Sequence, residues 1–375
     1  MAAAKILSLE RTTVSASRLT QGARNVVHTK RPHHPSKASA VTIQNTNLAQ
    51  RQSRSFATAV DTTTSTDDNA PFQRLNYLHK ITAANPFITE KGAPAEPSEF
   101  EFPLGTLFKA PTREVGLALT SMYAHAIREH GICGIEVGWP EPDSQFMLDV
   151  VNRMGCTPDT HSSTQGALWD VKYKPEGVYS QGTKKKAVSI SHSMGEFAWH
   201  TDAAFDEHPT RFFGFHIIHP DRQGGGVFRI LKAEDLARLL SPKAIDVLST
   251  HEFDLKVPPE FFKGKENVKG KLLNVDAATG RVHVRFRKDI LHDPPSADTE
   301  ANAAVKELND ILDAPRGVGK HVPEFVFKEN TVLLMDNARY LHSRTDIKDP
   351  KRWLRRVRFH GTPWSVKEQG HAASC

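Results

Sequence analysis

Trp199-His200-Thr201-Asp202-Ala203-Ala204-Phe205 is the stretch that decides how this chain is organised. In an extended segment the side chains alternate between two faces, so His200 and Asp202 project to the same side. His342, which comes after a short apolar run, can supply a third ligand. Two imidazoles and one carboxylate can occupy one face of an iron(II) ion and leave three positions open for substrate-derived ligands and O2. Because a His near an Asp is usually only a hydrogen-bonded surface pair, this interpretation depends on the residues that come after His342.

Basic residues follow His342 in a pattern that favours an enclosed anion site. The run Arg352-Trp-Leu-Arg-Arg-Val-Arg358 predicts a strand, and a period of two places Arg352, Leu354, Arg356 and Arg358 on one face. A guanidinium inside a barrel needs an anionic partner, and its fork of donors matches a carboxylate. This suits a dicarboxylate whose 2-oxo acid end chelates iron while its distal carboxylate meets Arg352. The alternative is a basic strand at the surface, and with seven basic residues among 344–358 some must be solvated.

Strand signals crowd together from Phe197 onward. Two polar, helical stretches, Ala233–Leu248 and Asp298–Leu312, interrupt them. Many short strands with a few covering helices predict a mostly β sandwich or barrel with flanking helices, an α+β chain in which no repeat is seen. The expected strands are Phe197–Thr201, Phe212–His219, Val227–Leu231, Leu272–Asn274, Val282–Phe286, Val332–Met335 and Trp353–Phe359.

The part of the chain before these strands contains two clear helical patterns. Thr112 opens one helix, whose apolar residues recur at helical spacing up to Ala126. Ser144–Met154 is the second, and Gly155 ends it. Strands are expected at Gly131–Val137 and Gly166–Tyr173. The region between Pro71 and Pro111 is Pro-rich and is expected to be irregular, with a short helical possibility around Leu75–Ala84, and Lys184–Lys186 is expected to be a solvated turn.

The first 60 residues differ in composition from the rest. They hold nine Lys/Arg and one acid, with apolar residues scattered between the charges. This pattern is typical of a mitochondrial transit peptide, and the alternative is a disordered leader in a cytoplasmic protein. We therefore expect a leader at 1–60, a linker and irregular lead-in at 61–95, one domain at 96–365 and a tail at 366–375.

Charge and cysteine content exclude several other classes of protein. Although the whole chain carries a net charge of +6, the 315 residues after the leader hold 40 basic and 42 acidic groups. That balance lacks the basic footprint of a nucleic-acid binder. No apolar run is long enough for a membrane span. Cys133, Cys156 and Cys375 show no metal-ligand spacing, which suits a reducing compartment. The expected partner is a small molecule, and the oligomeric state is left open.

With these residues in place, the sequence resembles the iron(II)/2-oxoglutarate-dependent dioxygenases of the taurine dioxygenase and clavaminate synthase-like family. The resemblance implies a distorted double-stranded β-helix (jelly roll) with His200, Asp202 and His342 as iron ligands. It also implies that Arg352 binds the far carboxylate of 2-oxoglutarate and that Arg356 contacts co-substrate or substrate. Fe(2+) would be the metal, with 2-oxoglutarate and O2 as co-substrates. The matching blocks, within roughly residues 110–362, are 199–205, Asn337-Ala-Arg-Tyr-Leu-His-Ser-Arg-Thr345 and Arg352-Trp-Leu-Arg-Arg356.

One position departs from that family. Its members commonly place a Thr after the glycines that follow the first metal strand, where the hydroxyl helps to hold 2-oxoglutarate. Here Gly224-Gly-Gly226 is followed by Val227, which cannot supply a hydrogen bond. Either Arg229 or another group substitutes for it, or 2-oxoglutarate binds less tightly.

The sequence indicates the type of reaction more narrowly than the class of substrate. The block His-Thr-Asp-Ala-Ala-Phe is closer to members that oxidise amino acids, and Arg285, Arg287 or Arg356 could meet a substrate carboxylate, so we expect hydroxylation of a small amino-acid-like or carboxylate substrate. One alternative is a carnitine-pathway hydroxylase of a trimethylammonium substrate, although the Gly-x-Tyr ending of that group is missing here. Another is a catalytically silent, metal-binding jelly roll. A third is a zinc hydrolase with Glu196 or Glu207 as general base, which leaves the arginines unexplained.

Overall fold

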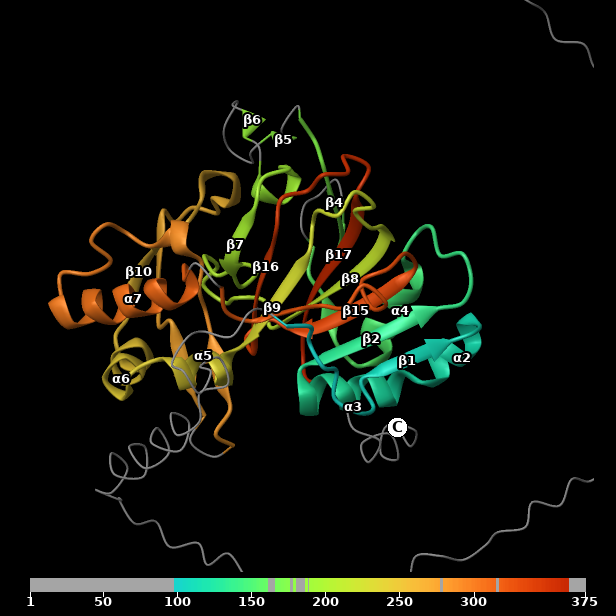
Figure 1. The fold of residues 1–375 in the computed structure, drawn as a ribbon, viewed down its shortest axis with the longest axis horizontal. Coiled ribbons are helices and arrows are strands. Elements are labelled where there is room, and N and C mark those ends of the chain that lie inside the picture. Colours follow the sequence, from blue (N-terminus) through green and yellow to red (C-terminus); the bar gives the residue numbers. More distant parts are fainter. Residues whose placement is uncertain are drawn as a thin grey trace, which may run out of the picture. The chain divides into compact units, whose positions relative to one another are not determined.

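Two β-sheets stacked face to face form the centre of the molecule, with helices on both outer sides (Figure 1). The computed structural model describes residues 98–160, 166–175, 178–179, 186–187, 189–276, 279–314 and 317–363. All of them fall within one compact unit, Ser65–Cys375. The predicted fold class, mostly β with flanking helices in a distorted double-stranded β-helix, is confirmed.

In the described part of the chain, the larger sheet has seven strands in the order β1-β2-β15-β8-β17-β3, with β4 also paired to β17. Only the β1–β2 pair of these strands is parallel. Every residue of β15 is buried, because the sheet is covered on both faces. The strands are β1 (Leu107–Ala110), β2 (Ile132–Val137), β3 (Thr157–Pro158), β4 (Leu168–Lys172), β8 (Phe212–His219), β15 (Thr331–Asp336) and β17 (Trp353–His360).

The smaller sheet has four antiparallel strands in the order β14-β9-β16-β7. Side chains from both sheets meet in a shared core, to which the larger sheet gives Phe213 and Leu354 and the smaller one gives Phe228 and Ile230. This core holds the sheets together through apolar burial. The strands are β7 (Phe197–His200), β9 (Phe228–Lys232), β14 (Lys320–His321) and β16 (Tyr340–Arg344).

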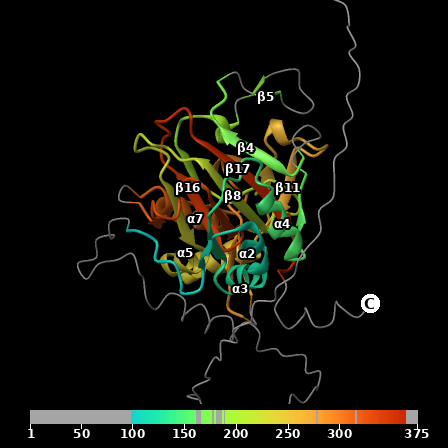
Figure 2. The same ribbon diagram turned by 90° about the vertical axis from the view of Figure 1, so that its right-hand side faces the viewer.

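Three helices cover the outer face of the larger sheet (Figure 2). They are α2 (Arg113–Ala118), α3 (Thr120–His130) and α4 (Gln145–Arg153). Thr112 caps α2 as predicted, since its side chain accepts a hydrogen bond from the Val115 N–H (3.4 Å). The sequence predicts one continuous helix from Thr112 to Ala126, and this prediction is wrong. The first helix ends at Ala118, Leu119 interrupts it, and a second helix, α3, begins at Thr120.

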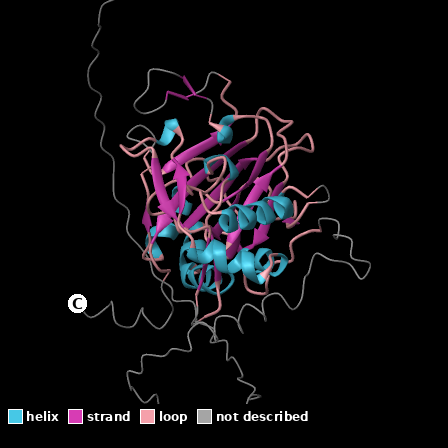
Figure 3. Cartoon of the chain, turned by 90° about the vertical axis from the view of Figure 1, so that its left-hand side faces the viewer, coloured by secondary structure: helices cyan, strands magenta, loops and turns pink. Residues whose placement is uncertain are grey.

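The segment 233–314 lies between β9 and β14 and covers the outer face of the smaller sheet (Figure 3). The prediction of one helix over Ala233–Leu248 is wrong, because Leu240 is extended and Ser241 and Pro242 start a second helix there. Pro at the first helical position and a Ser cap favour a new start over continuation. The segment contains α5 (Ala233–Leu239), α6 (Pro242–Thr250), β10 (Phe253–Lys256), β11 (Asn267–Gly270), β12 (Leu273–Val275), β13 (Val282–Val284) and α7 (Thr299–Leu312), with 3-10 turns η2 (Pro259–Phe261) and η3 (Lys288–Ile290).

Some sequence predictions fall outside the described residues. They are the leader at 1–60, the lead-in at 61–95, the helical possibility at Leu75–Ala84, the tail at 366–375, and Lys184 and Lys185 of the expected turn. Two short strands, β5 (Val178–Tyr179) and β6 (Lys186–Ala187), and the turn η1 (Ile190–His192) precede β7. Within the described ranges, no helix is long and apolar enough to cross a membrane.

Candidate metal centre

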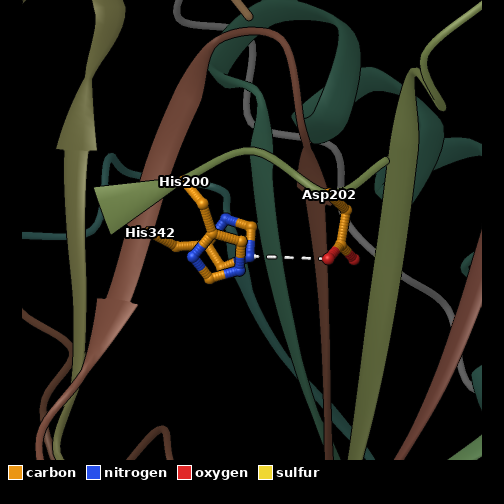
Figure 4. A group of neighbouring side chains, drawn as sticks. All are labelled: His200, Asp202 and His342. Atoms are coloured by element: carbon orange, nitrogen blue, oxygen red, sulfur yellow. Dashed lines mark ion pairs between the residues drawn. The ribbon is translucent and has the colours of Figure 1, made fainter. Parts of the chain in front are cut away.

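His200, Asp202 and His342 meet at the open edge of the smaller sheet (Figure 4). His200 ends β7 and pairs directly with His342 on the neighbouring strand β16, while Asp202 lies two residues beyond His200. One ligand atom from each residue lies within 4.8 Å of the others. All three side chains are buried. Among the described residues, no other set of three His, Cys, Asp or Glu side chains converges in this way.

Local contacts fix how the His200 ring is presented. Its Nδ1 lies 2.8 Å from the Ala198 carbonyl oxygen, so Nδ1–H donates there and Nε2 keeps its lone pair. The Phe197 ring stacks on the imidazole, with centroids 3.6 Å apart and planes at 12°. A hydrogen bond from the second ring nitrogen to a carbonyl is the usual way to orient a metal-binding His.

The protonation states match those that a divalent metal requires. Burial lowers the pKa of His200 well below its usual value and lowers the pKa of His342 to about 4. Burial alone would raise the pKa of Asp202, but the nearby Arg356 and the two imidazoles hold it below the usual range. At neutral pH the group therefore offers two neutral nitrogens and one carboxylate, which fits iron(II).

Two residues position Asp202. Arg356 Nη1 donates to both carboxylate oxygens, at 2.7 and 2.9 Å. The Asn337 side chain binds the backbone, because its Oδ1 accepts from the Asp202 N–H (2.7 Å) and its Nδ2 donates to the carbonyls of Asp202 (2.9 Å) and Thr210 (2.7 Å). These three hydrogen bonds hold the backbone after Asp202 in a bend, in which Ala203 has a φ of +55°. No role was predicted for Asn337, although an amide in the block before His342 was an available signal.

Arg352 is a buried guanidinium with free donors. Its side chain is 2% exposed, and Nε and Nη1 have no hydrogen-bond partner in the described part of the chain. Burial lowers its pKa to about 9. Gly226, at a φ of +60°, passes so close that an added Cβ would lie 3.1 Å from Arg352 Nε. A carboxylate is the ligand that such a fork of unpaired donors fits.

The strand β17 divides its side chains as the period of two predicts. Leu354 joins the core between the sheets and Arg356 reaches Asp202, whereas Arg355 turns outward to Asp170 (3.0 Å). Arg352 precedes the strand, and a register shift separates Trp353 from Leu354. The strand is therefore not a solvated surface strand.

Other residues named from the sequence are engaged elsewhere. Arg229 donates to Ser343 Oγ (3.0 Å) and to Glu196 (2.6 Å). Val227 N–H donates to Thr345 Oγ1 at 3.0 Å, so a hydroxyl from the residue that follows β16 lies beside the position where the family has Thr. Arg285 donates to the carbonyls of Ala204 and Asp206, at 2.7 and 2.8 Å.

A pocket opens beside two of the three converging side chains, His200 and Asp202, which line it. Phe197, Phe261, Arg287, Arg356 and Arg358 contribute to its lining. Phe261 and Arg287 come from segment 233–314, so the pocket is closed by residues from outside the two sheets. Its charged lining is cationic apart from the carboxylate of Asp202.

Comparison with known proteins gives a family match and similar folds. The family model "Taurine catabolism dioxygenase TauD, TfdA family" matches residues 122–358. No curated protein matches the chain. A solved asparagine oxygenase in complex with Fe(II), 2S,3S-3-hydroxyasparagine and succinate is 18% identical, with a TM-score of 0.50 over 78% of this chain and 91% of that one. The non-heme iron oxygenase OrfP in complex with Fe and alpha-ketoglutaric acid is 17% identical, with a TM-score of 0.47 over 76% and 91%.

Proposed function

The chain belongs to the taurine catabolism dioxygenase TauD, TfdA family, and we propose that it is an iron(II)- and 2-oxoglutarate-dependent dioxygenase that hydroxylates a small amino-acid-like or carboxylate substrate. Succinate and CO2 are the co-products. The observation that carries this proposal is a buried group of two neutral imidazoles and one carboxylate in the same interior as a buried arginine with free donors.

Each residue has a distinct part in the proposed reaction. His200, Asp202 and His342 would hold the iron, which when bound couples decarboxylation of 2-oxoglutarate to oxidation of a carbon–hydrogen bond. Arg352 binds the distal carboxylate of 2-oxoglutarate through its unpaired Nε and Nη1. Arg356 keeps the Asp202 carboxylate ionised and oriented. The apolar rings around the site limit the access of water.

The first experiment measures 2-oxoglutarate-dependent O2 uptake and succinate release by the full chain loaded anaerobically with iron(II). We expect His200→Ala to abolish turnover through loss of iron, and Arg352→Ala to raise KM for 2-oxoglutarate about 10- to 100-fold. His219→Ala and Arg355→Ala are matched controls, since these side chains bind Asp349 and Asp170 outside the site. Absence of turnover together with absence of iron and 2-oxoglutarate binding would refute the proposal.

The preference for a carboxylate substrate comes from the charges that line the pocket. Arg287, Arg356 and Arg358 line the pocket beside His200 and Asp202. Arg287 is paired with Asp289 and Arg356 with Asp202, so the positive charge that remains is that of Arg358. Cations favour an anionic substrate and disfavour the trimethylammonium group of a carnitine-pathway substrate. A panel of amino acids, simple carboxylates and trimethylammonium compounds in the same assay separates these two classes.

Two other functions make different predictions for the same protein. A silent, metal-binding jelly roll would bind iron and 2-oxoglutarate yet release no succinate with any substrate. A zinc hydrolase would need a general base at the metal, but Glu196 is paired with Arg229 and Glu207 with Lys265. Neither acid lines the pocket over the metal ligands. Hydrolysis with zinc in the absence of O2 would favour the hydrolase.

For residues 1–60 we propose a mitochondrial targeting role, supported by nine basic residues and a single acid. A fluorescent protein fused behind residues 1–60 is expected to enter mitochondria, and replacing Arg11, Arg18 and Arg24 by Gln should return it to the cytoplasm. Cytoplasmic fluorescence from the unchanged fusion would count against targeting.

A further inference from the structure

Arg358 on β17 is a second largely buried arginine whose side chain forms no hydrogen bond with the described residues. Its side chain is 9% exposed, and its Nε is buried with no hydrogen bond. Of the four buried arginines in the described ranges, Arg339 and Arg344 donate to backbone carbonyls. Arg352 and Arg358 form no side-chain hydrogen bond within those ranges. The donors of Arg358 are therefore available to a ligand, and a carboxylate matches them.

Arg358 lies at the junction of two hollows. It lines the pocket over the metal ligands and also a larger cavity of about 380 Å3. Phe205 and Phe261 line both as well, with rings stacked at a centroid distance of 4.4 Å. An apolar wall therefore continues from the metal pocket into a space of the size that holds small ligands.

The acids near this junction are already engaged. Asp202 is bound by Arg356. Asp159, whose backbone N–H donates to the Arg358 carbonyl, is bound through its carboxylate by Thr210 and lies 3.1 Å from His360 Nε2. The charge of Arg358 is thus left for a molecule that enters the cavity.

The remaining acids that line the cavity are also paired. Asp206 lies 3.5 Å from Lys263, and Glu207 lies 2.8 Å from Lys265. The proposed co-substrate does not supply the missing anion either, because its two carboxylates are taken by iron and Arg352. An anionic group on the other substrate is what remains.

We propose that Arg358 binds a carboxylate of the prime substrate at the junction of the two hollows, and so selects carboxylate-bearing substrates. This inference rests on the proposed function and adds to it a residue that determines substrate specificity. The carbon skeleton lies along Phe205 and Phe261, which leaves a carbon–hydrogen bond directed toward the metal ligands.

The test compares matched acids and amides. L-Amino acids, their deaminated carboxylates and the corresponding primary carboxamides are titrated into the full chain loaded with iron(II) and 2-oxoglutarate. Binding is read by anaerobic calorimetry and turnover by succinate release. In the unchanged protein, acids should bind about 10- to 100-fold more tightly than their amides, because the amide cannot form a charge-assisted pair.

Variants assign this preference to one residue. Arg358→Gln should reduce the acid-over-amide ratio to near one, and Arg358→Lys should restore part of it. Arg355→Gln is the matched control, since Arg355 lies on the opposite face of the same strand and binds Asp170. A purely structural role would lower acid and amide binding equally and leave the ratio intact.

Several outcomes would overturn the inference. They are an acid preference that survives Arg358→Gln, neutral or cationic compounds that bind as well as the anionic ones, or no binding by any anionic compound. The failure of the proposed function looks different, because the unchanged protein would then bind no iron and consume no 2-oxoglutarate before any panel compound is added.

Discussion

At the residue scale, the position of Asp202 depends on Asn337, a residue that is not one of the proposed metal ligands. Asn337 makes three hydrogen bonds to backbone groups of Asp202 and Thr210, and it fixes the bend in which Ala203 adopts a positive φ. Such a bend costs free energy and persists only where its surroundings hold it. The position of the carboxylate is therefore set by an amide on the loop that joins β15 to β16.

Replacing Asn337 by Ala is expected to weaken iron(II) binding about 10- to 100-fold, as loss of an orienting group does at other metal sites. Asn330→Ala is a matched control, because Asn330 also binds two backbone carbonyls, those of Val137 and Trp139, but away from the centre. Both variants should lose stability, and only Asn337→Ala should lose iron affinity in an anaerobic competition titration. Equal iron affinity in the two variants would contradict this role.

The residues predicted from the sequence are those whose chemistry is visible in their type and spacing. Two imidazoles, one carboxylate and alternating arginines indicate a metal and an anion wherever they occur together. Asn337 and Phe197 act by holding a backbone and by stacking on a ring, functions that many residue types perform. The structure was needed to find them.

At the element scale, the start of α6 shows how a local signal overrides periodicity. Ser241 Oγ accepts from the Ala244 N–H (3.1 Å) and donates to Glu307 on α7 (2.9 Å). Pro242 then occupies the first helical position. The apolar pattern runs through this junction unchanged, which is why it predicts one helix where the chain forms two.

Ser241→Ala should lower the free energy of unfolding by about 1–2 kcal/mol, because both the cap and its contact with α7 are lost. Thr250→Ala at the other end of α6 is the control, since its exposed hydroxyl donates only to carbonyls of its own helix, those of Asp246 and Val247. Urea unfolding monitored by circular dichroism measures both. A change for Ser241→Ala no larger than that for Thr250→Ala would show that the cap does not hold the helix start.

The sequence predicts some strands of the structure and misses others. The sequence predicts β8 from its continuous apolar run and β17 from its alternation. It does not predict β16, which holds His342, because Thr331–Arg344 reads as one apolar run with a polar break. It does not predict β1, β10 or β11 either, because each is only four residues long. Pairing makes them strands, β1 with β2 and β10 with β11.

At the scale of the whole molecule, two neutral histidines, His192 (buried) and His283 (half-buried), make stability depend on pH. Burial lowers the pKa of both His192 and His283 to about 4, from an ordinary value of 6.5. Between these values the unfolded chain binds a proton at each residue and the folded chain does not. Their contribution is therefore complete above about pH 6.5 and is lost as the pH falls toward 4.

We expect the free energy of unfolding to fall across this window, by up to about 3 kcal/mol for His192 and by less for His283, whose partial exposure screens the effect. His283 sits 3.2 Å from Arg211 Nη2, which donates to the neutral ring. His283→Gln keeps an acceptor and cannot be protonated, so its unfolding free energy should vary less with pH. Urea unfolding at pH 7, 5.5 and 4.5 gives the free energy of unfolding as a function of pH for the unchanged protein and for His283→Gln. The same dependence on pH in both proteins would show that His283 does not contribute to it.

Segment 233–314 leaves the smaller sheet at the end of β9 and returns at β14, which pairs with β9 itself. Its two ends are therefore neighbours, the arrangement that lets a fold accept one insert in place of another. The three converging ligands lie outside the segment, whereas Phe261 and Arg287 lie within it. The metal ligands and Arg358 thus lie outside the segment, which supplies only one wall of the pocket. Evolution, or a designer grafting a different insert with its covering core, can reshape that wall and leave both the metal ligands and the proposed carboxylate-binding residue in place.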